Sequence, residues 1–148
     1  MWTIGFLYID EALKLLESSF SFIKIEKNFE KKIQFYGFET QFCQAILNIL
    51  CNAKDIFIER KIENPCMKIS AFKKERNIVI EIHDNAKGII ISPIEKIFEP
   101  YISSKHANMG TGIGLYMSKV IIEKNFKGSL SVSNENNGAK FSIYLVNF

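Results

Sequence analysis

Three polar side chains recur on one face of a predicted helix in the first half of the chain. Asn48 and Asn52 lie four residues apart and Asp55 follows three residues later, which places all three on the same side of a helix. Amide and carboxylate oxygens are ligands that a hard cation such as Mg²⁺ accepts when phosphates complete its coordination shell. Taken alone, the pattern is more often a polar face turned to solvent, so both interpretations stay open here.

A single carboxylate ends a predicted strand near the middle of the chain. Residues 78–82 carry isoleucine at every second position, and Asp84 follows on the same side before the chain turns through Gly88. A buried carboxylate there accepts a hydrogen bond from an exocyclic amine, which adenine has and guanine does not present at the same position. Because an unpaired buried acceptor costs about 1–3 kcal/mol, such a group can select the base. Taken alone, the Asp84-Asn85 pair is more commonly an ordinary turn.

A glycine-rich loop precedes the last predicted helix. Residues 110–115 have glycine at every second position, so their backbone N–H groups can approach an anion closely, and the following helix adds the partial positive charge of its N-terminus. The loop matches neither the dinucleotide-binding fingerprint nor the Walker loop. Upstream, residues 97–105 offer the aromatic rings of Phe98 and Tyr101, and Lys105 can reach a phosphate as a point charge.

The spacing of apolar residues predicts the elements that position these groups. We expect helices over residues 10–20, 39–61 and 113–125, a short helical turn at 94–98 within an irregular stretch at 92–109, and strands over residues 22–29, 32–36, 67–72, 77–83, 129–133 and 139–146. Residues 22–29 and 32–36 are expected to form one hairpin, and residues 136–138 the turn of another, because asparagine and glycine tolerate a positive φ. These elements predict an α+β fold, a two-layer sandwich with helices covering one face of a mixed sheet.

Length and composition fit one globular domain covering residues 1–148. Hydrophobic residues make up 47% and charged residues 24%. The net charge is only +3, and the sequence shows no stripe of basic residues that would bind nucleic acid. Cys43, Cys51 and Cys66 are too far apart for a metal or redox pair, which predicts reduced thiols in the cytoplasm. The apolar start is about half as long as a membrane span, so we expect no membrane contact. Residues 1–8 are either a segment packed on the domain or the stump of a preceding region.

In their order and spacing, these four segments resemble the N, G1, F and G2 boxes of the catalytic ATP-binding domain of bacterial sensor histidine kinases. This domain (HATPase_c) belongs to the GHKL superfamily, which it shares with gyrase and the Hsp90 chaperones. The similarity extends over residues 9–145. The position of Asp55 after Asn52, and a short lid between Lys105 and Gly110, resemble the nitrogen-regulation branch of these kinases.

The resemblance implies a Bergerat ATP-binding fold with a lid, and ATP and Mg²⁺ as cofactors. By this similarity Asn52 coordinates Mg²⁺, Asn48 and Asn52 are the catalytic residues, and Asp84 reads adenine. Hydrolytic relatives have a glutamate base at the position of Asn48, so an asparagine there implies phosphoryl transfer rather than efficient hydrolysis. The implied nucleotide-binding residues are Asn48, Asn52, Asp55, Asp84, Ala86, Gly88, Ile89, Lys105, Gly110, Thr111, Gly112, Ile113, Gly114 and Leu115.

Two departures from the family pattern qualify this expectation. Ala86 replaces a usual glycine, which is tolerated at negative φ and costs about 1 kcal/mol or more at positive φ. His83 and His106 lack the sequence context of the phosphorylated histidine, so we expect the acceptor on a separate or missing phosphoacceptor and dimerisation domain, with a response regulator as the indirect partner and this chain a monomer. The alternatives are a degenerate nucleotide-binding or docking module without kinase activity, and an anti-sigma-factor-type serine kinase, against which residues 97–105 argue.

Overall fold

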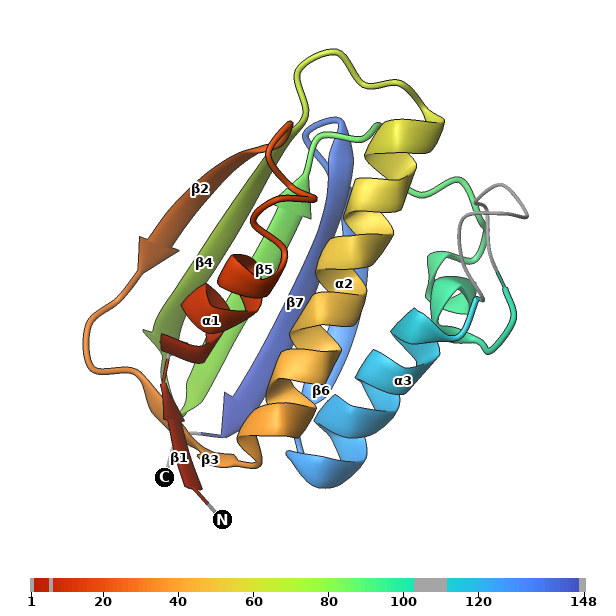
Figure 1. Cartoon of the computed structure of the whole chain (residues 1–148). Helices are drawn as coiled ribbons and strands as arrows, with labels where there is room; N and C mark the ends of the chain where they lie inside the picture. The colour runs from red at the N-terminus through yellow and green to blue at the C-terminus, as the bar shows by residue number, and fades with distance from the viewer. Residues whose placement is uncertain (1, 6, 103–111, 147–148) are drawn as a thin grey trace.

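A long helix packed on a mixed sheet forms the centre of the molecule (Figure 1). The structure, a computed structural model, describes residues 2–5, 7–102 and 112–146, with side chains from residue 9 onward. In chain order its elements are β1 Trp2–Gly5, α1 Leu7–Leu15, β2 Lys24–Phe29, β3 Gln34–Gly37, α2 Glu39–Glu59, β4 Cys66–Lys74, β5 Asn77–Asp84, the 3₁₀ helix η1 Ile94–Phe98, α3 Gly114–Val120, its π-helical continuation η2 Ile121–Asn125, β6 Ser129–Glu135 and β7 Gly138–Val146.

The main sheet has five strands in the order β2-β4-β5-β7-β6, and α1, α2 and α3 all lie on one of its faces (Figure 1). Strands β2 and β4 are parallel, whereas the other neighbouring pairs are antiparallel. This arrangement confirms the predicted α+β fold, a two-layer sandwich with a mixed sheet. No helix among the described residues is long and apolar enough to cross a membrane.

The amphipathic pattern of α2 fixes how the two layers meet. Its buried residues recur at helical spacing from Phe42 to Phe57, and they pack on the inward side chains of the sheet, which include Ile80 and Ile143. The remaining side of α2 is free to carry polar groups. The helix therefore presents Asn48 and Asn52 along its edge while its apolar stripe anchors it to the core.

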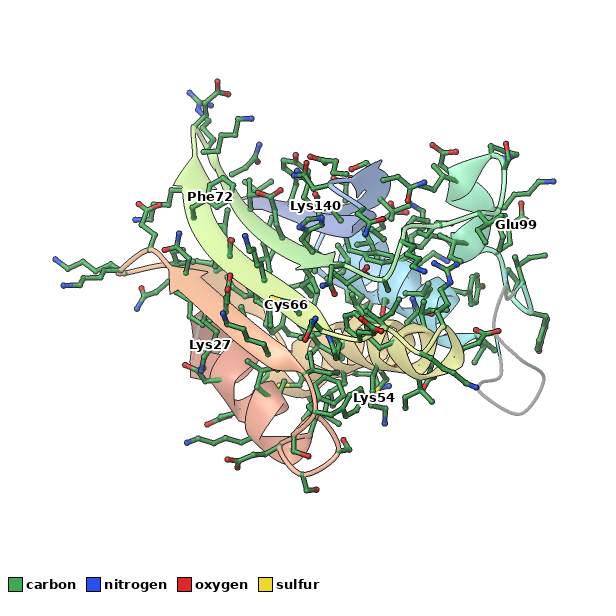
Figure 2. All side chains as sticks on the ribbon, turned by 90° about the horizontal axis from the view of Figure 1, so that it is seen from above. Lys27, Lys54, Cys66, Phe72, Glu99 and Lys140 are labelled. Carbon is green, nitrogen blue, oxygen red and sulfur yellow. The ribbon has the colours of Figure 1, made fainter. Side chains whose placement is uncertain are left out.

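The other face of the sheet lies away from the helices and is polar around His83 and Lys140. Lys140 on β7 contacts the carboxylates of Glu81 and Glu135 at 2.9 and 2.8 Å, and His83 lies within 2.8 Å of the Glu135 carbonyl oxygen. Seen from above, Lys140 and the helix residue Lys54 lie on opposite sides of the sheet (Figure 2). His83 therefore belongs to this polar face, while its neighbour Asp84 points inward.

The predicted hairpin of residues 22–29 with 32–36 is wrong. β3 instead pairs antiparallel with β1 in a separate two-stranded sheet, and β2 pairs in parallel with β4. Parallel pairing is possible because α2 provides the crossover between the two strands. β3 turns away from the main sheet to bury Phe35, whose ring lies 4.9 Å from that of Phe42 and 6.4 Å from that of Phe126.

The first and last predicted helices differ in their bounds. α1 begins earlier than expected and ends at Leu15, and residues 16–20 form turns in which the Ser19 hydroxyl donates to the Leu16 carbonyl at 3.1 Å. Such local side-chain bonds compete with the helical backbone ladder. The predicted helix over residues 113–125 is present as α3 followed by η2.

A buried hydroxyl joins the two helices that flank the pocket described below. The Ser118 hydroxyl on α3 donates to the Ala45 carbonyl of α2 at 2.8 Å. Ser118→Ala is expected to lower the free energy of unfolding by about 1 kcal/mol, because a buried hydrogen bond is lost. Urea denaturation measures this loss. The matched control is Ser131→Ala on the exposed part of β6, and an equal effect of the two substitutions would contradict the assigned role of Ser118.

Candidate functional site

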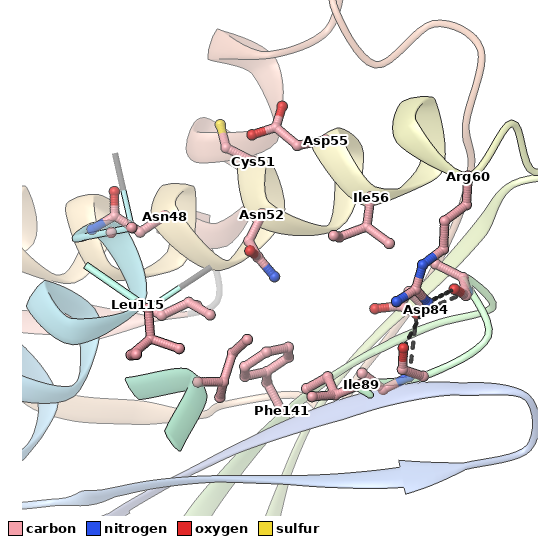
Figure 3. Close-up of a pocket in the computed structure, with 17 residues that line it drawn as sticks. Asn48, Cys51, Asn52, Asp55, Ile56, Arg60, Asp84, Ile89, Leu115 and Phe141 are labelled. Carbon is pink, nitrogen blue, oxygen red and sulfur yellow. Dashed lines mark hydrogen bonds between the residues drawn. The ribbon is translucent and has the colours of Figure 1, made fainter. Parts of the chain in front are cut away.

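A cleft opens between α2, the loop after β5 and the start of α3 (Figure 3). Its free volume, including the part open to solvent, is about 870 Å³, a size suited to a small-molecule ligand. The predicted nucleotide-binding residues that line it are Asn48, Asn52, Asp55, Asp84, Ala86, Gly88, Ile89, Gly112, Gly114 and Leu115. Ile113 is the N-cap of α3 and is not among the lining residues. Lys105, Gly110 and Thr111 lie outside the described residues, as does His106.

The polar edge of α2 forms one wall of the cleft. Asn52 points from the helix toward the sheet in Figure 3, and Asn48 lies one turn earlier. Gln44 donates its Nε2 to Asn48 Oδ1 at 3.1 Å, which holds the amide of Asn48 in one orientation. A Cβ added at Gly114 would lie 3.7 Å from Asn48 Cβ, so the N-terminus of α3 packs closely against this part of α2.

Asp84 provides the one buried carboxylate of the lining. It is 6% exposed, and its Oδ1 accepts hydrogen bonds from the backbone N–H groups of Ala86 at 2.9 Å and Ala139 at 3.2 Å. Burial raises the pKa of Asp84, and the two backbone donors oppose that shift only in part. No described residue donates to Oδ2, so this oxygen is available to a ligand in the cleft.

Close backbone packing fixes the place of Asp84. A Cβ at Gly138 would lie 1.6 Å from the carbonyl oxygen of Asp84, so only glycine allows β7 to come this near to the end of β5. The turn before it follows the predicted pattern, with φ of 46° at Asn136 and 61° at Asn137. Gly138 therefore serves both the hairpin turn and the site.

The loop after Asp84 accommodates the alanine that departs from the family pattern. Ala86 is buried and is not among the residues with positive φ, which fall instead on Lys87 at 74° and Gly88 at 81°. Ala86 therefore avoids the positive φ that would make alanine costly at this position. Asn134 holds the far side of the loop, because its side chain accepts from the N–H of Ile89 at 2.7 Å and donates to the carbonyl of Ile89 at 2.9 Å.

This combination of fold and cleft agrees with a protein-family comparison. The family described as histidine kinase-, DNA gyrase B-, and HSP90-like ATPase matches residues 37–147. The chain belongs to this family. It is 32% identical over 115 residues to the two-component sensor PprA of Pseudomonas aeruginosa, covering 74% of this chain and 12% of that protein. It is also 32% identical over 137 residues to a protein named as an NtrY-like sensor histidine kinase of Rickettsia conorii, covering 92% of this chain and 22% of that protein.

Solved structures of histidine kinases share the fold. The catalytic domain of histidine kinase ThkA superposes with a TM-score of 0.85 at 24% identity, covering 99% of this chain and 95% of that one. At this identity the likeness establishes the fold. The chain spans 12%, 25% and 21% of the length of the first three curated relatives, which makes it similar to one part of each.

Several residues of the ATPase-family cleft were not predicted from the sequence. These are Cys51, Ile56, Arg60, Ile97, Ile102, Ala139 and Phe141. The signal for Ile56 and Arg60 was present, because both continue the four-residue steps that begin at Asn48. Phe141 follows from the alternation of β7, and its ring contacts that of Phe98 with centroids 6.1 Å apart. Its position under the cleft depends on strand order, which the sequence pattern did not specify.

The lining is compatible with a divalent cation only together with a ligand. The described residues contain no group of three or more His, Cys, Asp and Glu side chains that could hold a metal by themselves. Asn52 supplies an amide oxygen, and Asp55 adds a carboxylate to the same wall. Hard cations take such oxygens together with phosphate oxygens, so this donor set fits Mg²⁺ bound with a nucleotide.

Proposed function

We propose that this domain binds ATP with Mg²⁺ and transfers the γ-phosphoryl group to a histidine on a phosphoacceptor and dimerisation domain in two-component signal transduction. The observation that supports it best is the placement of the buried Asp84 carboxylate in the same cleft as the asparagine face of α2. One end of the cleft can recognise a base, and the other can bind phosphates.

At the base end, Asp84 Oδ2 accepts the exocyclic amine of adenine. Oδ1 already holds two backbone N–H groups, so the carboxylate cannot turn away to satisfy itself elsewhere. Guanine presents an oxygen at the corresponding position, which would leave two acceptors facing each other. Gly88 and Ile89 line the same end and allow the base to lie close to the backbone.

At the phosphate end, Asn48 and Asn52 hold the triphosphate and the cation. Asn48 to Arg60 spans about 18 Å of helix at 1.5 Å per residue, enough to extend along a nucleotide. When bound, Mg²⁺ neutralises part of the phosphate charge, and Asn52 is the residue that would hold it. The amide of Asn48 cannot accept a proton, so the chain's own residues favour transfer to an incoming nucleophile over activation of water. By the family resemblance alone, we also assign Lys105, Gly110 and Thr111, which lie outside the described residues, to nucleotide binding.

Within the sensor histidine kinases, we place the domain in the nitrogen-regulation branch. In this proposal a response regulator receives the phosphoryl group after the histidine. Asp55 in its position after Asn52 supports the branch, together with the similarity to the NtrY-like protein. We place the domain in the cytoplasm, where ATP is available and its three cysteines, none of which forms a disulfide in the described structure, remain reduced, without contact to nucleic acid or membrane. We treat residues 1–148 as one domain.

Calorimetric titration with ADP and AMPPNP, with and without Mg²⁺, tests the binding half of the proposal. We expect micromolar affinity, about −8 kcal/mol, and tighter AMPPNP binding with Mg²⁺. The transfer half is tested with γ-labelled ATP and a purified histidine phosphoacceptor and dimerisation domain, where the expected product is acid-labile. A folded chain that binds neither nucleotide would instead be a docking module, and an acid-stable phosphoserine product would indicate a serine kinase.

A further inference from the structure

One nitrogen of the Arg60 side chain connects α2 to the loop at the base end of the cleft. Arg60 is the C-cap of α2, and its Nη1 donates to the carbonyl oxygens of Ala86 at 2.5 Å and Gly88 at 2.6 Å (Figure 3). Each terminal guanidinium nitrogen has two N–H bonds, so Nη1 alone satisfies both carbonyls. Arg60 also lines the cleft itself.

The loop that Arg60 contacts has an unusual backbone. Lys87 and Gly88 are consecutive residues with φ of 74° and 81°. A lysine in this region is uncommon and is kept there only when surrounding contacts determine the loop. Arg60 supplies those contacts from the cleft side, whereas Asn134 binds Ile89 from β6.

Arg60 also brings a positive charge near Asp84 from the C-terminal end of α2. Burial raises the pKa of Asp84, and the charges of His83 and Arg60 both oppose that shift. Among the other charged groups, Asp55 lines the same cleft, and Lys87 in the loop lines a neighbouring pocket together with Lys61 and Glu63. On the opposite face of the sheet, Lys140 is engaged by Glu81 and Glu135.

We propose that Arg60 is a positioning residue for base recognition: it fixes the carbonyls of Ala86 and Gly88 to the end of α2 and so holds the loop that follows Asp84 in place. This inference rests on the proposed function, because it assigns a role within the same nucleotide cleft. Base and phosphates are thereby positioned from one helix, since Arg60 is the C-cap of α2 and follows Asn52 by eight residues. The spacing between the two ends of the cleft then does not depend on the loop alone.

Three substitutions separate this role from general support of the loop. Arg60→Met keeps the apolar stem but removes the donors and the charge, whereas Arg60→Lys keeps a charged donor. Asn134→Ala loosens the same loop from outside the cleft without changing its charge. Circular dichroism first establishes that each variant is folded. ADP affinity is then measured by calorimetry, and the Asp84 titration is followed in the nucleotide-free domain by carboxyl-carbon NMR.

We expect Arg60→Met to weaken ADP binding about tenfold or more, with the larger loss at lower pH, and to move the Asp84 titration to higher pH. Arg60→Lys should stay within about threefold of the unmodified chain, and Asn134→Ala should leave the Asp84 titration unchanged. An unchanged Asp84 titration in Arg60→Met, or equal ADP losses in Arg60→Met and Asn134→Ala, would overturn the inference. Because the titration needs no nucleotide, an unmodified chain that binds no ADP would refute the proposed function while the Arg60 contact is still tested.

Discussion

Asp84→Asn is expected to weaken ADP binding by about a hundredfold or more while leaving the domain at least as stable as before. The amide oxygen can replace Oδ1 and keep the backbone N–H groups of Ala86 and Ala139 as donors. The amide nitrogen then occupies the place of Oδ2 and presents N–H bonds to the amine of adenine, so two donors face each other. ADP binding is weakened because a hydrogen-bond acceptor, Oδ2, is replaced by a donor at the position that faces the adenine amine.

The stability effect has the opposite sign and depends on pH. Because burial raises the pKa of Asp84 in the folded state, the ionised carboxylate destabilises the fold at pH values above that pKa. As the pH falls through the folded pKa toward the unfolded one, the folded state takes up the proton first and this penalty disappears. The advantage of Asp84→Asn over the unmodified chain should therefore be largest near neutral pH and vanish below about pH 4.

Calorimetric ADP titration together with thermal unfolding at several pH values measures both effects. The matched control is Asp10→Asn, which removes a partly exposed carboxylate bound to Lys27 at 2.7 Å on the α1 side of the molecule. That substitution should leave ADP affinity unchanged. If Asp84→Asn bound ADP as tightly as the unmodified chain, Asp84 would not be the base-reading group.

The parts of the fold that were predicted from the sequence are those set by local patterns. The buried stripe of α2, the alternation of β4 and β5, and the turn of the β6–β7 hairpin each lie within one short segment. The pairing of β3 was not predictable in this way. It depends on Phe35 meeting Phe126, which lies ninety-one residues further along the chain, and on α2 carrying the chain across the sheet.

In the candidate site, too, the residues set by local sequence patterns were predicted, whereas contacts between distant segments were not. Asn48, Asn52 and Asp84 were predicted because their spacing and position are local, and the structure brings them to one cleft. The four-residue steps from Asn48 place Arg60 on the cleft side of the helix, but its contacts were missed because its partners are backbone carbonyls in a loop more than twenty residues away. Likewise, Gly138 was read as a turn residue, although its contact with the Asp84 carbonyl is what makes glycine necessary there.

Asn52→Ala is expected to reduce phosphoryl transfer by about a hundredfold or more and to make AMPPNP affinity insensitive to Mg²⁺. The substitution removes the amide oxygen that we assign to the cation but leaves the base end of the cleft intact. ADP measured in EDTA should therefore bind nearly as before. Titration of AMPPNP with Mg²⁺ and with EDTA gives this comparison, and labelled ATP with the acceptor domain gives the rate.

Two further variants make the assignment of Asn52 specific. Asn52→Asp restores an oxygen ligand that Mg²⁺ prefers and adds a negative charge beside the phosphates, so AMPPNP binding should become more dependent on Mg²⁺ than in the unmodified chain. Asn28→Ala changes an exposed asparagine on β2, away from the cleft, and should alter neither measurement. If AMPPNP binding by Asn52→Ala still depended on Mg²⁺, the cation would be held by Asp55 or by ligand oxygens alone. Asn52 would then serve the triphosphate directly, because its amide still lies on the phosphate side of the cleft.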